Sequence, residues 1–190
     1  MKNQTQNDET LRNLRKEFFA FRNGIVADKL RNAGDPHTVI MGCLLVDVMT
    51  IASGIRESIA DEERLAAIAQ KLWDDTNSRE CRLAAPMLYP PKLMNLDLAT
   101  QWSQSVETTE VADNLCHKLL RQIPDADTLW RQLIADERPL IKYTGYRLLL
   151  NLMTLDKVQT TPTLRAIIEN EASQAQPPLA QLIQSILEEF

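Results

Sequence analysis

Apolar residues recur along this chain at helical spacing from one end to the other. Between Asp8 and Asn32 they stand mostly three or four residues apart, which is the spacing of one helix face: Leu11, Leu14, Phe18, Phe21, Ile25 and Leu30. Gly24 interrupts this segment at a cost of about 1 kcal/mol relative to alanine. We therefore expect either a close helix–helix approach at Gly24 or a break into two helices there.

Proline, glycine and capping residues divide the rest of the chain into further helices. Gly34 with Asp35-Pro36 ends the first segment, and Pro90-Pro91 separates two later ones. No stretch alternates as a strand would, so the pattern predicts an all-α protein. The later helices are expected at Val39–Ile55, Glu62–Trp73, Arg79–Leu88, Leu96–Ser103, Thr108–Arg121, from Asp125 through Trp130, Arg138–Met153, from Thr161 and from Pro177.

The three tryptophans indicate a repeat. Trp73, Trp102 and Trp130 stand 29 and 28 residues apart, and a second apolar helical segment follows each of them after about ten residues. A unit of about 30 residues, helix then helix, is typical of a stacked α-solenoid. We predict a right-handed α-α superhelix of HEAT-like or ARM type with about ten helices. At equivalent repeat positions the tryptophans favour core packing over base stacking.

Short turns without a linker predict one domain over residues 8–190, after a disordered lead-in over residues 1–7. No run approaches the 18 apolar residues that a membrane helix needs, and the N-terminus lacks the apolar core of a signal peptide. We therefore expect a cytoplasmic protein without a membrane partner. A solenoid presents a long concave surface, which favours a binding protein over an enzyme.

The net charge of −5 argues against a protein that holds nucleic acid by a general positive charge. That argument fails if the basic residues converge on one face. Several of them belong to the second helices of successive repeats or to their edges: Arg79, Arg82, Lys118, Arg121, Arg138, Lys142 and Arg147. A plain solvated surface explains their distribution equally well.

The sequence contains no pattern of metal ligands or catalytic nucleophiles. Cys43, Cys81 and Cys116 are odd in number, far apart and set among apolar neighbours, so we expect buried, reduced thiols. His37 and His117 are isolated, and adjacent residues such as Cys116 and His117 point in different directions from a helix. We expect no metal and no cofactor.

Three stretches resemble a known family. They are LAAIAQKLWDDTNSRECRLAAPMLYP, ETTEVADNLCHKLLRQIP and ERPLIKYTGYRLL, and the opening RNGIVADKLRNAG followed by VIMG fits them. Together they resemble the HEAT-like proteins of the DNA alkylation repair group, the AlkD-like DNA glycosylases and their relatives. The resemblance covers residues 20 to 155 and implies the fold more strongly than the reaction.

The resemblance also implies site residues. In these glycosylases the central helix begins Ser-Trp-Asp-x-x-Asp, and its last Asp stabilises positive charge developing on the sugar. The matching stretch here runs from Thr108 to Asp113, so Asp113 matches the catalytic carboxylate and Thr109 stands at the Trp position. An Arg-Arg pair that grips phosphate is matched by Lys142-Tyr143. The family's C-terminal Trp has no counterpart after Trp130.

Three functions fit these observations. The first is a non-catalytic module that binds nucleic acid or protein on its concave face, the second an active glycosylase with Asp113 as its carboxylate, and the third a protein–protein scaffold with no DNA role. The partner would be double-stranded DNA or another protein. The residues expected to contact nucleic acid are Arg79, Arg82, Lys118, Lys142, Tyr143 and Arg147.

Overall fold

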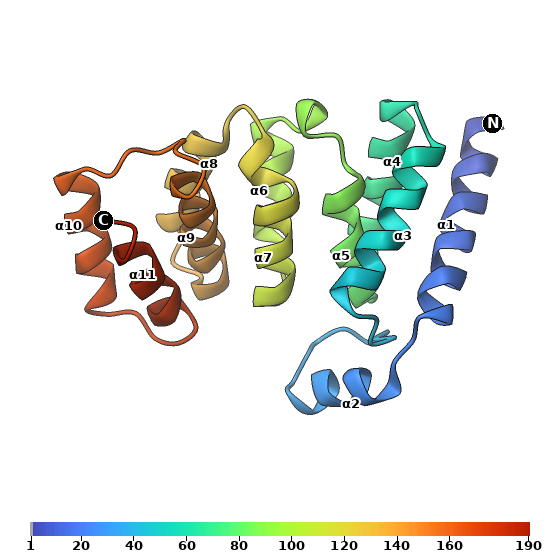
Figure 1. Cartoon of the computed structure of the whole chain (residues 1–190), viewed down its shortest axis with the longest axis horizontal. Coiled ribbons are helices and arrows are strands. Elements are labelled where there is room, and N and C mark those ends of the chain that lie inside the picture. The colour runs from blue at the N-terminus through green and yellow to red at the C-terminus, as the bar shows by residue number, and fades with distance from the viewer. Residues whose placement is uncertain (1) are drawn as a thin grey trace. The chain divides into compact units, whose positions relative to one another are not determined.

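The computed structural model describes residues 2–190, and all regular elements in that range are helical (Figure 1). The prediction of an all-α fold is therefore confirmed. The chain divides into two compact units, one ending at Met94 and one beginning at Asn95, where we predicted a single domain. The division falls directly after Pro90-Pro91 and the short 3₁₀ helix η1 (Pro91–Leu93).

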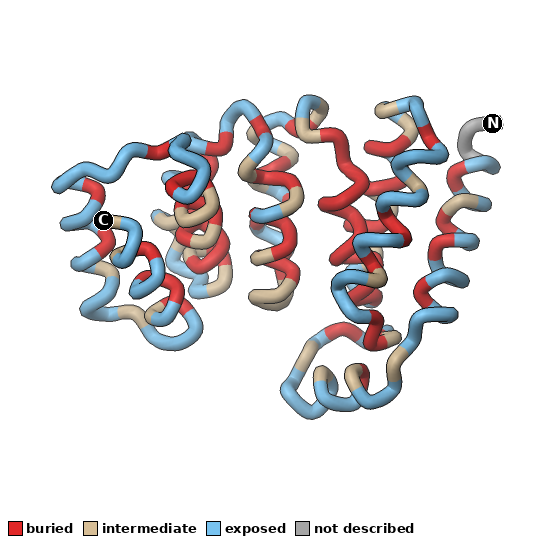
Figure 2. The backbone as a smooth tube through the Cα atoms, in the orientation of Figure 1, coloured by how far each residue is buried: buried red, intermediate tan, exposed pale blue. Residues whose placement is uncertain are grey.

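Unit 1 contains the five α-helices α1 (Lys2–Ala20), α2 (Gly24–Asn32), α3 (Leu45–Ser58), α4 (Glu62–Trp73) and α5 (Arg79–Leu88). Helix α5 is the centre of this unit, because it packs against α3 and α4 and all of its residues are buried (Figure 2). Helix α1 covers α3 and α4 from outside. Helix α2 lies beyond the end of α1 and the start of α3 and buries only Ala27.

Helix α1 begins at Lys2, within the stretch that we expected to be disordered. The reason is a set of polar contacts from α4 that the apolar pattern does not reveal. The Arg64 guanidinium donates to Asn7 Oδ1 at 3.0 Å, and the Lys71 ammonium lies 2.7 Å from the Asp8 carboxylate. These contacts hold the first polar turns of α1 against the unit. Met1 lies outside the described residues.

At Gly24 the chain breaks into two helices, which is one of the two expected outcomes. Helix α1 ends at Ala20 and α2 begins at Gly24. Asn23 caps α2, since its side-chain oxygen accepts from the backbone N–H groups of Ile25 and Val26. The backbone N–H of Asn23 in turn donates to the Met41 carbonyl at 2.8 Å, which ties the break to the segment after α2.

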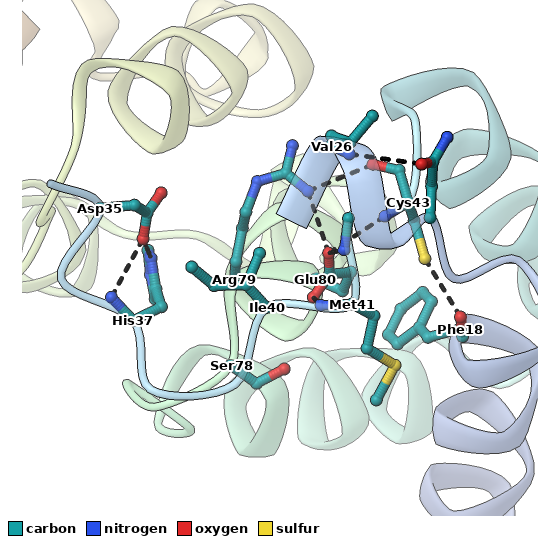
Figure 3. Close-up of polar contacts among 12 residues, drawn as sticks. Phe18, Val26, Asp35, His37, Ile40, Met41, Cys43, Ser78, Arg79 and Glu80 are labelled. Atoms are coloured by element: carbon teal, nitrogen blue, oxygen red, sulfur yellow. Dashed lines mark hydrogen bonds and ion pairs between the residues drawn. The ribbon is translucent and has the colours of Figure 1, made fainter. Parts of the chain in front are cut away.

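The helix expected from Val39 begins only at Leu45, because residues 39–44 form an extended strap around a buried carboxylate (Figure 3). Glu80 is fully buried on α5 and accepts from the backbone N–H groups of Met41, Gly42 and Cys43 at 3.0–3.3 Å. The Arg79 guanidinium donates to the same carboxylate at 2.9 Å. The apolar run therefore forms a carboxylate-binding loop instead of a helix turn.

Unit 2 contains the six α-helices α6 (Leu96–Gln104), α7 (Thr109–Lys118), α8 (Ala126–Ile134), α9 (Pro139–Met153), α10 (Pro162–Ala172) and α11 (Leu179–Leu187), and the 3₁₀ helix η2 (Leu120–Gln122). Helix α9 is its centre and packs against α7, α8 and α11, while α6 packs against α8. Packing against the next helix and the next but one is typical of a solenoid. The HEAT-like character of the repeats stays a prediction.

The tryptophans are core residues, as expected from their spacing. Trp73 in unit 1, and Trp102 and Trp130 in unit 2, are all less than 4% exposed. None of the described helices is both long and apolar enough to cross a bilayer.

The strap yields a stability prediction. Gly42 has φ +76°, and a Cβ there would lie 2.2 Å from the Asn23 carbonyl oxygen and 2.6 Å from the Ala27 nitrogen. We expect Gly42→Ala to lower the free energy of unfolding by more than about 3 kcal/mol in urea titrations, because backbone strain and a backbone clash add.

Two glycine controls separate these causes. Gly34→Ala has the same backbone strain, with φ +85°, but open space around its Cβ, and should cost about 1 kcal/mol. Gly54→Ala lies in α3 with open space and should be neutral or stabilising by up to about 1 kcal/mol. Equal losses in Gly42→Ala and Gly34→Ala would show that the close approach is unimportant.

Candidate functional site

Asp113 lies in a cluster with two residues of α9. Its carboxylate accepts from the Tyr143 hydroxyl at 2.8 Å and from Arg147 Nε and Nη2 at 2.6 and 3.2 Å. Tyr143 and Arg147 are one helical turn apart, and the Arg147 guanidinium also donates to the Tyr143 oxygen at 3.2 Å. We call these three residues the Asp113 cluster. The side chains of Asp113 and Arg147 are 40% and 28% exposed, so the cluster reaches the surface.

Close helix packing fixes the cluster. Thr108 caps α7 by accepting from the Val111 backbone N–H, which sets the start of the helix that carries Asp113. The Cys116 thiol donates to the Thr144 carbonyl at 3.4 Å and joins α7 to α9. At Gly145 the backbones of α8 and α9 meet, because a Cβ there would lie 2.8 Å from the Ile134 nitrogen.

Basic side chains surround the exposed edge of α7. Burial and the nearby charges of Arg121, Lys118 and Arg147 lower the pKa of His117. Lys157 belongs to the same surface, since its ammonium donates to the Arg121 carbonyl at 2.7 Å. We define the basic surface as Lys118, Arg121, Arg147 and Lys157. It lies in a unit that contains only 8 Lys and Arg against 13 Asp and Glu, so the positive charge is local.

The predicted contact residues are separated by the structure. Lys118, Tyr143 and Arg147 come together around α7 and α9, whereas the Lys142 ammonium forms an ion pair with Glu171 of α10 at 3.2 Å. Arg121, which the charge argument included, belongs to the basic surface. Lys157 was missed, because it follows α9 in a turn and no helical spacing connects it to Arg121.

The prediction that Arg79 and Arg82 contact nucleic acid is wrong, because both are buried in unit 1. Arg79 is 3% exposed and donates to Glu80 and to the Cys43 carbonyl. Arg82 is fully buried, donates to the Trp73 carbonyl and lies 3.6 Å above the Trp73 ring. Arg79 thus links α5 to the strap and Arg82 links it to α4, and burial removes both guanidinium groups from the surface.

A pocket opens beside the Asp113 cluster, where α9 meets the segment that joins α10 to α11. It has a volume of about 320 Å³, and its lining is mainly apolar, including Leu140, Pro177 and Pro178. Tyr143 and Thr109 line it as well, so the pocket shares the Tyr143 ring with the cluster. Its size falls in the range of small-molecule sites.

The cysteines are reduced and buried, and burial raises the pKa of each thiol, to about 11 for Cys43 and Cys81.

Across residues 2–190, no group of His, Cys, Asp and Glu side chains is arranged to hold a metal ion.

The cluster yields a prediction about ionisation. Burial raises the pKa of Tyr143 to about 12, although Arg147 acts in the opposite direction. An unfolded tyrosine has a pKa of about 10, so the neutral phenol contributes stability that is complete below pH 10 and is lost as the pH rises towards 12. We expect the difference in unfolding free energy between wild type and Tyr143→Phe to shrink across that range. Ultraviolet titration that assigns Tyr143 a pKa near 10, by difference from Tyr143→Phe, would contradict this.

The comparison with protein families agrees with the all-α fold. The model of the family described as "DNA alkylation repair enzyme" matches residues 14–182. No curated protein and no solved structure gave a significant match. Because the family model matches most of the chain, from α1 to α11, the chain belongs to the DNA alkylation repair family.

Proposed function

We propose that this protein is a non-catalytic member of its family that binds double-stranded DNA on the α7–α9 surface of unit 2. One observation carries the proposal: the Asp113 carboxylate is held by both Arg147 and Tyr143. A bare carboxylate would repel phosphates, but this one is neutralised by the guanidinium. The charges of Lys118 and Arg121 are then free to attract a nucleic-acid backbone.

The same observation argues against strong catalysis. A carboxylate that stabilises an oxocarbenium-like sugar must direct its charge at the substrate. The charge of Asp113 is instead shared among three hydrogen bonds within the protein. Thr109, at the position of the glycosylase Trp, supplies no aromatic wall for a cationic base. The pocket beside it has one aromatic ring, that of Tyr143, and two of its charged lining residues, Lys142 and Glu171, are paired with each other.

A second candidate function is base excision with Asp113 as the catalytic carboxylate. It is favoured by the 40% exposure of the Asp113 side chain and by the pocket beside Tyr143, which could receive a base or alkyl group. In this alternative Arg147 would have to leave Asp113 for a phosphate when DNA binds. The two candidates differ in base release and not in binding.

The binding proposal predicts a salt dependence. A duplex with an abasic-site analogue, titrated by fluorescence anisotropy at about 50 and about 200 mM salt, should bind more weakly at high salt. The variant Lys118→Ala/Arg121→Ala should bind at least about tenfold more weakly at low salt and lower the salt slope by about 2, because two phosphate contacts are lost.

Arg165→Ala is the matched control for this experiment. Arg165 is an exposed arginine of α10 in the same unit, and it is paired with Glu169. Its removal lowers the net charge by one without touching the basic surface, so binding should change little. Equal losses in the control and the double variant, or no binding by wild type at low salt, would exclude this surface and favour a protein scaffold.

The non-catalytic assignment is tested with a duplex that carries radiolabelled methylated purines. Wild type should release no base beyond the rate of spontaneous loss, and Asp113→Asn should behave identically, because the paired carboxylate does not act on the sugar. Enzymatic release by wild type that disappears in Asp113→Asn, with duplex binding retained, would establish the glycosylase instead.

A further inference from the structure

Most of the large apolar side chains that are exposed among the described residues lie at one end of unit 1. This end comprises the C-terminus of α1, helix α2, the strap and the first turns of α3; we call it the α2 end. Ile25 is the most exposed at 72%, followed by Val46 at 59% and Phe19 at 57%. The others are Phe21, Val39, Leu44, Leu45 and Met49. An exposed apolar cluster of this kind marks an interaction surface.

Hydrogen bonds make this end one contiguous surface. The Asn23 N–H donates to the Met41 carbonyl at 2.8 Å, which joins the α1–α2 connection to the strap. The Cys43 thiol donates to the Phe18 carbonyl at 3.1 Å, so Phe19 and Leu44 are carried on adjacent segments. In Figure 1, α2 and its two connections lie together beyond the ends of α1 and α3.

The apolar side chains are held in place from beneath. Glu80 fixes three consecutive backbone N–H groups of the strap, and Arg79 fixes the Cys43 carbonyl (Figure 3). The close approach of Gly42 to Ala27 locks the strap to α2. Leu44, Leu45 and Val46 therefore follow directly from an anchored segment, and their exposure is a property of the folded state.

Positive charge is interleaved with these apolar residues. Residues 12–34 contain six Lys and Arg and two Asp and Glu, in a chain whose net charge is −5. Lys16 is three residues before Phe19 on α1 and Lys29 is four after Ile25 on α2, so each cation shares a helix face with an exposed apolar side chain. Neither lysine forms an ion pair within residues 2–190. Of the nearby carboxylates, Asp28 is paired with Arg31, Asp35 is held by His37, Asp47 is partly buried and Glu17 is exposed beside Lys16.

We propose that the α2 end is a peripheral binding surface for an anionic lipid bilayer. Exposed Phe, Leu, Ile and Val enter the boundary between headgroups and acyl chains, while Lys and Arg beside them meet anionic headgroups. This function is additional to DNA binding and uses the other unit of the chain. It departs from our expectation of no membrane partner, which rested on the lack of a membrane-spanning segment; peripheral binding requires no such segment.

Other partners fit these observations less well. A partner helix would need an apolar groove, but the hollow at this end is lined partly by Arg22 and Arg31, and Phe19 alone of the exposed apolar set lines it. A two-fold dimer through this surface would bring the same cations face to face. Nucleic acid stacks on aromatic rings, whereas most of the exposed apolar set is aliphatic.

The test uses the full-length chain and co-sedimentation with vesicles. Vesicles of phosphatidylcholine with about 30 mol% phosphatidylserine should bind the protein, and pure phosphatidylcholine vesicles should bind it far less. Lys16→Glu/Lys29→Glu should lower the partition coefficient at least about 20-fold, since each lysine contributes about fivefold. Ile25→Glu/Val46→Glu should lower it by a similar factor, because both side chains leave the acyl boundary.

Leu155→Glu/Ile167→Glu provides the matched control. These side chains of unit 2 are 42% and 46% exposed, so the substitutions add the same charge as Ile25→Glu/Val46→Glu at surface sites of the other unit and should leave partitioning unchanged. Absence of binding to anionic vesicles, equal binding to neutral ones, or equal losses in the control would overturn the proposal. A parallel loss of duplex binding in Ile25→Glu/Val46→Glu would overturn it in favour of a nucleic-acid surface.

Discussion

The buried carboxylate of Glu80 is the interaction on which the arrangement of unit 1 depends. It accepts from three backbone N–H groups of the strap and from the guanidinium of Arg79, and of these partners Gly42, Cys43 and Arg79 are buried. A buried charge is tolerated only when such partners are complete, and removal of one partner typically costs about 3–5 kcal/mol. The carboxylate thus replaces a helix turn as the link between α5 and the start of α3.

Unit 2 also contains a carboxylate whose hydrogen bonds come from protein groups, but at a site that is open to water. Asp113, Tyr143 and Arg147 satisfy one another between α7 and α9, yet two of the three side chains are partly exposed. In the proposed binding mode the pair stays closed, neutralises Asp113 and leaves the cations at the end of α7 to attract phosphate. In the catalytic alternative the guanidinium would have to leave Asp113 for a phosphate.

The apolar pattern predicted the helices that pack mainly through apolar side chains, and it failed where polar contacts determine the structure. It predicted the core positions of Trp102 and Trp130 and the extents of α4, α5 and α9 closely. It missed the first turns of α1, because Arg64 and Lys71 hold them through polar contacts distant in sequence. It also predicted helix for the strap, because nothing in the run VIMGCLLV indicates that these residues surround the Glu80 carboxylate.

The candidate site, like the fold, could be predicted only in part. The resemblance selected Asp113, and helical spacing places Tyr143 and Arg147 on one face of their helix. Helical spacing along the sequence could not show which arginines lie on the surface and which are buried. Arg82 stacks on Trp73, which becomes evident only when α4 and α5 are paired. The contribution of Lys157 depends on a turn that brings it back to Arg121.

The contact at Gly145 has a mechanical consequence for the proposed DNA surface. Because α8 and α9 touch backbone to backbone there, the two helices form a rigid pair, and Tyr143 and Arg147 keep their positions relative to α8. The pocket lies where α9 meets the segment that joins α10 to α11. The ion pair between Lys142 and Glu171 links α9 to α10 at the same place. A ligand too large for the pocket would therefore displace the C-terminal helices first and leave Tyr143 and Arg147 in place relative to α8.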